Sequence, residues 1–466
     1  MADLSSFLSE LNQIVEPKVK PQELVKPQEL VKPQELVKPQ ELVKPQELVK
    51  PQELVKTHPP VKILIVSTHA NQVNGYSKVA YNMIKQLSAH PWITVVHFAT
   101  HNLVNADIGR KLSVKVIDAS ALEKGDKKTG FAHAELPSMI QQEKPDVVFI
   151  YNDLAMICAY IEQIRKVFEQ RSFRVWAYVD TTYAMQPQSM IDNLNRDVER
   201  IFCFTKSWKD SIKSQGITRP IDVLRHGVDT SVFTPIPKQV ARQALGLPKD
   251  VFLFTSLNKN IPRKRLDLLI MSFVKLMIRH PLKPIYLLIV ANKEGSAGGY
   301  NLFDIFSREI KLQGEPVNVF GDRLLITSND TCYTDKDINA LNNCGDAGVS
   351  CAEGEGFGLC TFEQMAVGIP QIVPEINGYT DYCNVDNSLL VKPKMRYYIP
   401  YGHNALSGEA QIVDPDDVSK AMEQYVFNEN VRKLHATKAQ ETTQAYTWEK
   451  CIAPLVNRLS QISESD

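Results

Sequence analysis

The stretch "SCAEGEGFGLCTFEQMAVGIP", residues 350–370, combines a glycine-rich turn with an apolar run of helical character. We expect a strand to end before the turn and a helix to follow it, stopped by Gly368 and the proline after it. Gly356 and Gly358 let backbone amides at the helix start come close to a ligand. Amides at a helix N-terminus bind anions, and this turn therefore predicts a phosphate site.

Two acids flank that site, Glu355 within the turn and Glu363 about one turn inside the helix. Because the Glu363 side chain leans back toward the helix start, its carboxylate can reach hydroxyls of a ligand whose phosphates sit on the amides. A nucleotide-sugar carries ribose on one side of its diphosphate and a hexose on the other, which fits two acids around one anion site. The alternative is that Glu363 is a helix-surface residue and Glu355 only complements the helix dipole.

The segment "SLNKNIPRKRLDLLIMSF", residues 256–273, places four basic side chains between an expected strand and an expected helix. Cations at the carboxyl end of a strand can neutralise a diphosphate leaving group, which is the largest electrostatic need of glycosyl transfer. A solvated charge run is the alternative interpretation. The four residues are Lys259, Arg263, Lys264 and Arg265.

Gly75 is the one glycine of "STHANQVNGYSKVAYNMIKQL", residues 67–87, where another expected strand leads into a helix. A dinucleotide-binding fingerprint needs three glycines, so this segment is not one. Gly75 either lets the backbone approach a ligand in a cleft or forms an ordinary strand–helix turn.

These motifs lie among short apolar runs that alternate with helix-length segments in two series. Continuous apolar runs of this kind are typical of parallel strands covered on both faces. We therefore predict an α/β protein with two doubly wound, Rossmann-like domains facing across a cleft and a hinge near residues 233–238. The expected strands are 62–66, 93–99, 146–151, 174–179 and 200–205, followed by 251–257, 285–291, 347–351, 370–374 and 388–392.

The composition of the 466-residue chain, 44% hydrophobic, is that of a globular protein. Lys+Arg and Asp+Glu both number 53, which argues against a nucleic-acid-binding or polybasic membrane surface. No apolar run approaches the roughly 18 residues needed to span a bilayer. The eight cysteines form no CxxC pair, so we expect buried thiols in a reducing compartment, the cytoplasm.

Residues 20–55 are six identical copies of KPQELV. Proline removes an amide donor and disfavours a helical residue before it, so no continuous helix can pass through the repeat. We expect a disordered, extended spacer of partly polyproline character. The alternative is a docking ladder, in which residues 1–55 bind a protein partner.

With these motifs in place, the chain resembles a retaining glycosyltransferase of the GT-B fold, in the group-1, family-4-like set. The resemblance covers roughly residues 61–460 and excludes the repeat. It rests on four motifs, which are "HGVD" through Phe233 and Pro235, the basic loop with Lys259 and Lys264 ahead of Leu266 and Asp267, "EGFGL" from Glu355 through Glu363, and Trp448–Glu449. A chain in which an exact repeat precedes a folded part of this kind resembles proteins encoded by large DNA viruses. Such an origin would place the chain in a host cytoplasm.

The resemblance implies roles for particular residues. Lys259 and Lys264 would hold the diphosphate, Glu363 would bind ribose, and Glu355 would bind the donor sugar. Catalysis would rest on Glu355, Lys264 and Asp180. The remaining donor-binding positions are Gly356, Phe357, Gly358 and Leu359, whose amides would touch sugar and phosphate, and Gly75, which would approach the phosphates from the first domain.

Three positions depart from the family pattern. Lys259 stands where the family usually has arginine, which keeps the charge but loses the bidentate geometry. Asn74–Gly75 replaces a pair of glycines. Val179–Asp180 replaces a frequent His-Asp pair, so the histidine that often approaches the donor sugar is missing and Asp180 is its partial substitute.

The resemblance also implies a domain organisation. An N-terminal acceptor domain spans 61–237, a C-terminal donor domain spans 238–440, and a last helix at 441–466 packs back on the first domain. Before them lie a short amphipathic segment at 1–18 and the repeat spacer at 19–60.

No metal is expected in this chain. Asp335–Lys336–Asp337 and Asp414–Pro415–Asp416 look like metal-binding DxD pairs, but each precedes a helical run, and helix-start acids are the better interpretation. The ten histidines show no zinc-binding spacing.

We therefore predict a metal-independent hexosyltransferase that moves a sugar from a nucleotide-diphosphate-sugar to an unknown glycan, lipid or protein acceptor with retention of configuration. It needs no cofactor beyond the donor. The alternatives are a nucleotide-sugar epimerase or hydrolase on the same architecture and a non-catalytic GT-B-like adaptor tethered by its repeat.

Overall fold

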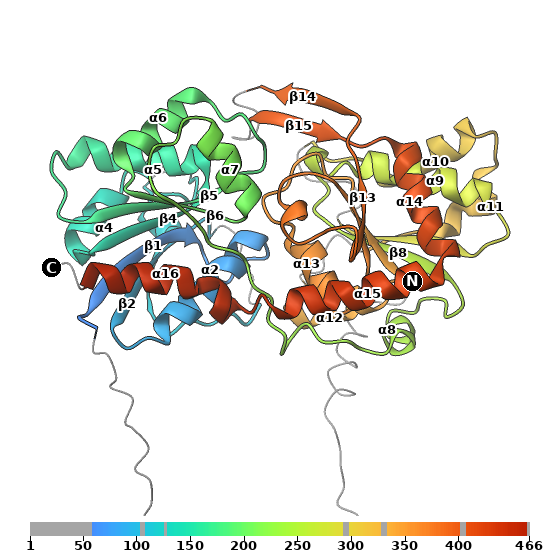
Figure 1. The fold of residues 1–466 in the computed structure, drawn as a ribbon, viewed down its shortest axis with the longest axis horizontal. Coiled ribbons are helices and arrows are strands. Elements are labelled where there is room, and N and C mark those ends of the chain that lie inside the picture. The colour runs from blue at the N-terminus through green and yellow to red at the C-terminus, as the bar shows by residue number, and fades with distance from the viewer. Residues whose placement is uncertain are drawn as a thin grey trace, which may run out of the picture.

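The computed structural model describes residues 58–102, 108–124, 128–291, 298–327, 333–400 and 407–463 (Figure 1). The amphipathic segment predicted at residues 1–18 and the repeat at 20–55 lie outside the described residues, so the spacer and docking interpretations stay predictions.

The first half of the described chain forms a seven-stranded parallel sheet in the order β3-β2-β1-β4-β5-β6-β7. Its central strands are continuous runs of buried aliphatic and aromatic side chains, as expected for a sheet covered on both faces. The strands are β1 (Val61–Thr68), β2 (Ile93–Thr100), β3 (Lys115–Asp118), β4 (Val147–Asp153), β5 (Arg174–Asp180), β6 (Arg200–Cys203) and β7 (Ile221–Val223). The helices are α2 (Gly75–Ser88), α3 (Ala119–Leu122), α4 (Leu136–Glu143), α5 (Leu154–Val167), α6 (Gln188–Asp197) and α7 (Lys206–Ser214).

The second half forms a six-stranded parallel sheet in the order β10-β9-β8-β11-β12-β13. Its strands are β8 (Phe252–Leu257), β9 (Ile285–Val290), β10 (Leu324–Ile326), β11 (Ala347–Val349), β12 (Gln371–Pro374) and β13 (Ser388–Val391). Its helices are α8 (Lys238–Ala244), α9 (Leu266–Arg279), α10 (Leu302–Leu312), α11 (Val317–Phe320), α12 (Asp335–Asn343), α13 (Leu359–Ala366), α14 (Pro415–Phe427) and α15 (Glu429–Gln444). The prediction of an α/β protein with two doubly wound parallel sheets is confirmed.

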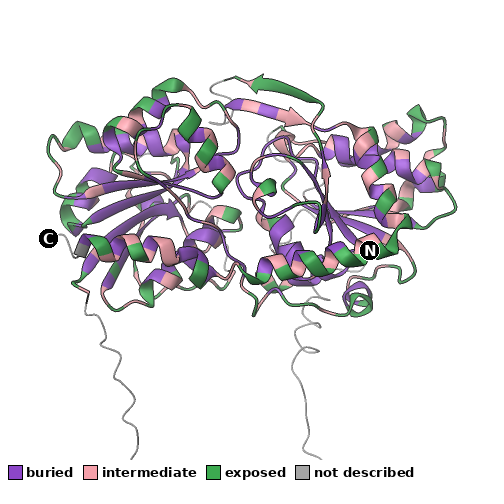
Figure 2. Cartoon of the chain, in the orientation of Figure 1, coloured by how far each residue is buried: buried purple, intermediate pink, exposed green. Residues whose placement is uncertain are grey.

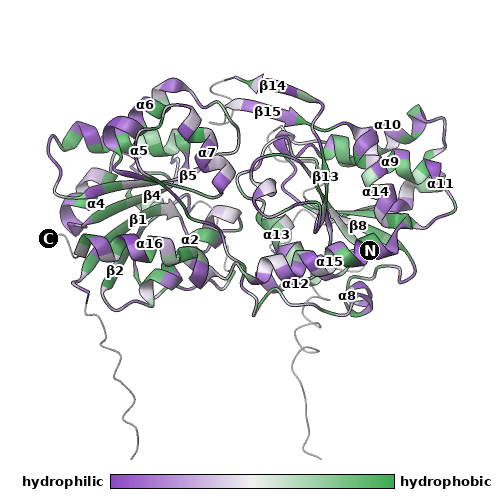
Figure 3. Ribbon diagram, viewed as in Figure 1, coloured by the Kyte–Doolittle hydropathy of each residue, from purple (hydrophilic) through white to green (hydrophobic). Residues whose placement is uncertain are grey.

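Each sheet has apolar layers on its two faces, and the burial pattern shows them clearly (Figure 2). In the first domain α2 packs on one face, while α4, α5 and α6 pack on the other. In the second domain α9, α10 and α14 cover one face, and α8 and α12 contribute to the other. The hydrophobic residues follow these layers, whereas the helix surfaces facing solvent are hydrophilic (Figure 3). Both cores therefore hold the carboxyl ends of their strands in fixed positions.

The chain crosses between the domains twice. It leaves the first domain after β7, and it returns between α15 and α16 (Trp448–Ser463), which packs against α2. The two crossings lie side by side, because the amide of Val228 donates to the carbonyl of Tyr446 at 2.9 Å. The exact domain boundaries given above stay predictions.

A third connection is a hairpin of β14 (Met395–Ile399) and β15 (Gly408–Ile412), which extends from the second domain over the first (Figure 1). The amide of Glu409 donates to the carbonyl of Ala184 at 2.8 Å. Gly408 has φ of 126°, and a Cβ there would lie 2.2 Å from the same carbonyl. The glycine is therefore required for the hairpin to reach the first domain.

Replacing Gly227 by alanine should destabilise the protein, because a Cβ at this position would lie 2.5 Å from the backbone nitrogen of Trp448. A backbone atom cannot rotate away, so we expect a loss of about 1–3 kcal/mol from overpacking. The midpoint of thermal unfolding measures the loss. Gly321→Ala is the matched control, since no atom lies within 4 Å of its added Cβ. Equal midpoints for the two variants would contradict the close packing of the crossings.

Candidate functional site

The glycine-rich turn after β11 packs directly against the carboxyl edge of the first sheet. A Cβ on Gly356 would lie 2.2 Å from Oδ1 of Asp180, and one on Gly354 would lie 2.5 Å from the ring of Tyr183. Trp208 of α7 fixes the turn by donating its Nε1 hydrogen to the carbonyls of Glu355 and Gly356, at 3.1 and 2.9 Å. The glycines thus let two domains meet at backbone distance, which larger side chains would prevent.

Helix α13 begins immediately after this turn. Its N-cap is Gly358 in the left-handed region, with φ of 90°, and no side chain caps the helix. Among the residues that the structure describes, none accepts a hydrogen bond from the amides of Gly358 or Leu359. The start of α13 therefore presents unsatisfied donors and the positive end of the helix dipole.

Basic side chains from the loop after β8 approach the same turn. Lys264 forms an ion pair with Glu355, and Arg263 donates to the carbonyl of Gly354 at 2.7 Å and lies 3.4 Å from the Glu355 carboxylate. Burial opposes ionisation of Glu355, but the charges of Lys264 and Arg263 outweigh it and lower its pKa. Glu355 is thus a buried carboxylate neutralised by cations.

Lys259 differs from these paired cations. It is exposed, and no described residue forms an ion pair or hydrogen bond with its ammonium group. Partial burial of the ammonium lowers the pKa of Lys259, and repulsion by Lys264 and Arg263 lowers it further. An anion bound between these residues would relieve that repulsion.

Asp180 lies beneath Gly356 at the end of β5. Tyr76 donates its hydroxyl hydrogen to Oδ2 at 2.7 Å, while Oδ1 is buried and has no partner in the described structure. Burial raises the pKa of Asp180 to about 6, although the hydrogen bond from Tyr76 and the charge of Arg263 oppose the shift. Near neutral pH this carboxyl can exchange a proton.

Glu363 of α13 has a different partner from Glu355. Its carboxylate is 3% exposed and pairs with Nζ of Lys78 on α2 of the first domain, at 2.5 Å. Burial raises the pKa of Glu363, and the ammonium of Lys78 opposes the rise. The acid predicted to bind ribose therefore lies at the contact between the two domains.

The structure brings most of the predicted site residues to one place. Lys264 pairs with Glu355, a Cβ on Gly356 would lie 2.2 Å from Asp180, and a Cβ on Gly75 would lie 3.4 Å from Leu359. Phe357 is buried, with its ring against His226 and Phe362 rather than facing a ligand. Lys259 lies close enough to Lys264 and Arg263 for their charges to lower its pKa, whereas Glu363 pairs with Lys78 of the first domain. The roles assigned to all these residues stay predictions.

Three further residues of the site were not singled out from the sequence. Lys78 is one turn of α2 beyond Gly75, and this helical spacing was the only signal for it. Tyr76 binds Asp180, and nothing in the sequence pointed to that contact. Arg263 was recognised as one of four cations but was not assigned to the site.

The two aspartate pairs that resemble metal ligands begin helices, as expected. Thr334 caps α12 in a reciprocal capping box with Asp337, and Asp414 caps α14 with Pro415 in its first turn. No group of three or more potential metal ligands occurs within the described ranges. The cysteines described there are all free, and each except Cys360 is buried. None of the helices in these ranges is long and apolar enough to cross a membrane.

No family model matches this chain. A curated relative, the lipopolysaccharide core biosynthesis mannosyltransferase LpsB of Rhizobium meliloti, is 31% identical over 163 residues. This match covers 35% of the chain, and the chain spans 42% of the length of that relative.

Solved structures match over almost the whole described chain. They include sucrose-phosphate synthase from Thermosynechococcus elongatus (TM-score 0.66, 15% identity) and a glycosyltransferase from Rickettsia africae (TM-score 0.64, 15% identity), each covering 87% of this chain and 100% of that chain. Anabaena HepE in complex with UDP and glucose matches with a TM-score of 0.63 at 14% identity, covering 86% of this chain and 100% of that chain. At such identities the likeness establishes the fold, and the expected GT-B architecture is confirmed.

Replacing Asp180 by asparagine should change how stability depends on pH. Because the folded pKa of about 6 is higher than the usual value for aspartate, the folded protein holds this proton more tightly than the unfolded chain does. Ionised Asp180 therefore destabilises the fold as pH rises from about 4 to 6, by roughly 3 kcal/mol at pH 7. Asp180→Asn should gain thermal stability over the wild type across that interval and keep the gain above it.

Asp222→Asn is the control, because the pH dependence of its stability relative to the wild type should have the opposite sign. Hydrogen bonds from Arg458 and Arg200 lower the pKa of Asp222 despite partial burial, so this variant should lose stability as pH rises through the acid range. A stability difference between Asp180→Asn and wild type that does not vary between pH 4 and 8 would contradict the assignment.

Proposed function

We propose that this protein is a glycosyltransferase that moves a sugar from a nucleotide-diphosphate-sugar to an acceptor. One observation carries the proposal. The uncapped start of α13 lies beside the cations of the β8 loop, and buried glutamates stand on either side of it. The mannosyltransferase relative and the complexes of HepE with UDP, glucose and UDP-glucose support this choice.

In this proposal the donor lies across the start of α13. Its diphosphate accepts hydrogen bonds from the amides of Gly358 and Leu359 and interacts with Lys259 and Lys264. Glu363 accepts hydrogen bonds from the ribose, and Glu355 from the hexose. Gly75 of the first domain lies beside Leu359, with an added Cβ at 3.4 Å from that side chain, so the first domain is close to the proposed position of the phosphates.

The chemistry follows from where charge develops. As the bond between sugar and diphosphate breaks, negative charge grows on the departing phosphate, and fixed cations with the helix N-terminus stabilise it. Because the chain's own lysines supply this positive charge, we propose a metal-independent reaction. Retention of configuration and membership of the family-4-like set are proposed from the motif resemblance. The reduced state expected of the buried cysteines supports a cytoplasmic location.

The second candidate is a non-catalytic GT-B-like adaptor. Its support is that both glutamates already have basic partners, Lys264 for Glu355 and Lys78 for Glu363, so that the site is internally neutralised. The histidine that often precedes Asp180 in the family is also missing. An adaptor predicts no stabilisation by any nucleotide.

Replacing Lys259 by methionine tests the diphosphate site. UDP and GDP are compared by thermal shift. Whichever nucleotide binds more tightly should stabilise the wild type by about 2.7 kcal/mol at 100 times its Kd. Lys259→Met should lower the affinity for that nucleotide by roughly 10–100-fold, because a charge-assisted hydrogen bond is lost. The exposed Lys249→Met is the matched control and should bind like the wild type. A wild type that no nucleoside diphosphate stabilises would favour the adaptor.

Replacing Glu355 by glutamine separates binding from turnover. The variant keeps the size of the side chain but releases Lys264 from its ion pair, so nucleotide binding should be unchanged or tighter. Turnover of the donor sugar should fall by at least about 100-fold, since a charged contact to the reacting sugar is lost. Nucleotide release from the donor, followed with and without acceptor, is the measurement. Unchanged turnover would remove Glu355 from the reaction.

A further inference from the structure

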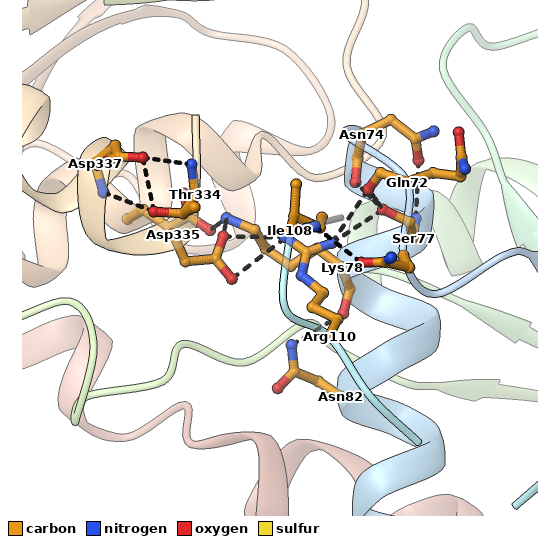
Figure 4. A network of polar contacts seen from close by, with 12 residues as sticks. Gln72, Asn74, Ser77, Lys78, Asn82, Ile108, Arg110, Thr334, Asp335 and Asp337 are labelled. Carbon is orange, nitrogen blue, oxygen red and sulfur yellow. Dashed lines mark hydrogen bonds and ion pairs between the residues drawn. The ribbon is translucent and has the colours of Figure 1, made fainter. Parts of the chain in front are cut away.

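A network of charged and polar side chains joins α2 and the loop before β3 in the first domain to α12 in the second (Figure 4). Lys78 of α2 lies 2.5 Å from Glu363 and 2.9 Å from Asp335, which belong to α13 and α12 of the second domain. The side chain of Lys78 is 13% exposed and that of Glu363 4%. These are the distances of strong, charge-assisted hydrogen bonds, and in the pair of Lys78 with Glu363 both groups are largely removed from water.

The lysine is held in place from both sides. Arg110 donates to Asp335 at 3.0 and 3.3 Å and to Oγ of Ser77, the neighbour of Lys78, at 3.0 Å. Asp335 sits in the first turn of α12, whose start is fixed by the capping box of Thr334. Figure 4 shows Lys78 and Arg110 converging on the carboxylate of Asp335. The ammonium of Lys78 is therefore positioned by both domains.

Glu363 depends on this lysine for its charge. Four groups face it, which are Lys78 from α2, Arg110 from the loop before β3, Asp335 from α12 and the Cys360 thiol of its own helix. Burial and the charge of Asp335 favour the protonated acid, while Lys78, and more weakly Arg110, favour the carboxylate. Lys78 alone among the described residues donates a hydrogen bond to the Glu363 carboxylate, and it does so at Oε1.

We propose that Lys78 is a positioning residue for the donor's nucleoside, because it holds Glu363 ionised and oriented so that Oε2 can accept hydrogen bonds from ribose hydroxyls. This inference rests on the proposed function. An ionised carboxylate is acceptor-only, whereas a protonated one spends an oxygen as donor and binds a diol less well. Since Lys78 comes from the first domain, the nucleoside site of the second domain is complete only when the domains are closed.

Lys78→Met tests the proposal through a pH profile. UDP affinity, measured by calorimetry, is expressed as a ratio to that of the wild type at each pH between 6 and 8.5, so that titration of UDP itself cancels and the wild type defines a flat reference profile. In Lys78→Met the pKa of Glu363 should rise, so affinity should fall about 10-fold at pH 6 and recover toward the wild-type value at pH 8.5. Lys78→Arg should restore the flat profile. An equal loss at every pH, or no loss, overturns the proposal.

Asp335→Asn is the matched control for domain contact. It removes an interdomain partner of Lys78 and Arg110 but keeps the pair between Lys78 and Glu363. Its pH profile should stay flat, because removing the charge of Asp335 favours ionised Glu363. A profile like that of Lys78→Met would show that domain contact, not ionisation, controls binding, and would overturn the proposal.

A second measurement needs no nucleotide. The thermal midpoint of Lys78→Met, relative to that of Lys78→Met with Glu363→Gln, should fall as pH rises from 5 to 8, because the unpaired buried carboxylate ionises. A constant difference overturns the dependence of Glu363 on Lys78. If this difference changes as expected while no variant binds UDP or GDP, it is the proposed function that fails.

Discussion

The whole arrangement depends on the contact between a glycine-rich turn and the edge of the opposite sheet. Gly356 packs so closely on Asp180 that a single added carbon would overlap the carboxylate. This approach brings the start of α13, the cations of the β8 loop and the end of β5 close together. It also buries the charges of the site, which is why their pKa values depart from ordinary ones. The chemistry proposed here follows from that closeness rather than from any one side chain.

Electrostatic pairing gives each glutamate a different basic partner. Glu355 is neutralised from within its own domain by Lys264, whereas Glu363 is neutralised by Lys78 from the other. The first pair is independent of how the domains sit, and the second exists only when they meet. The site therefore couples the protonation of one acid to the relative position of two domains.

Much of the fold was predictable because buried parallel strands leave a strong signal. Runs such as those of β1, β4 and β9 are continuously apolar, and each predicted run contains an observed strand. β7 and β10, with three residues each, lie outside the predicted runs, although the equally short β11 lies within the predicted run 347–351. β14 was missed because its residues are exposed and it pairs antiparallel outside both sheets. The acid–glycine turn was recognisable for its residue types, but the pair between Lys78 and Glu363 joins positions 285 apart, which no local pattern encodes.

The doubled crossing between the domains has a mechanical consequence. A single linker would let the domains rotate about any axis. Here two linker segments run side by side and are joined by the bond between Val228 and Tyr446. Two paired segments bend more readily about one axis than they twist. Opening about that axis would separate the domains most at the hairpin, where Glu409 contacts Ala184. Such opening would break the contacts of the hairpin with the first domain, which include this backbone bond and the bond from Gln186 to the carbonyl of Ser407.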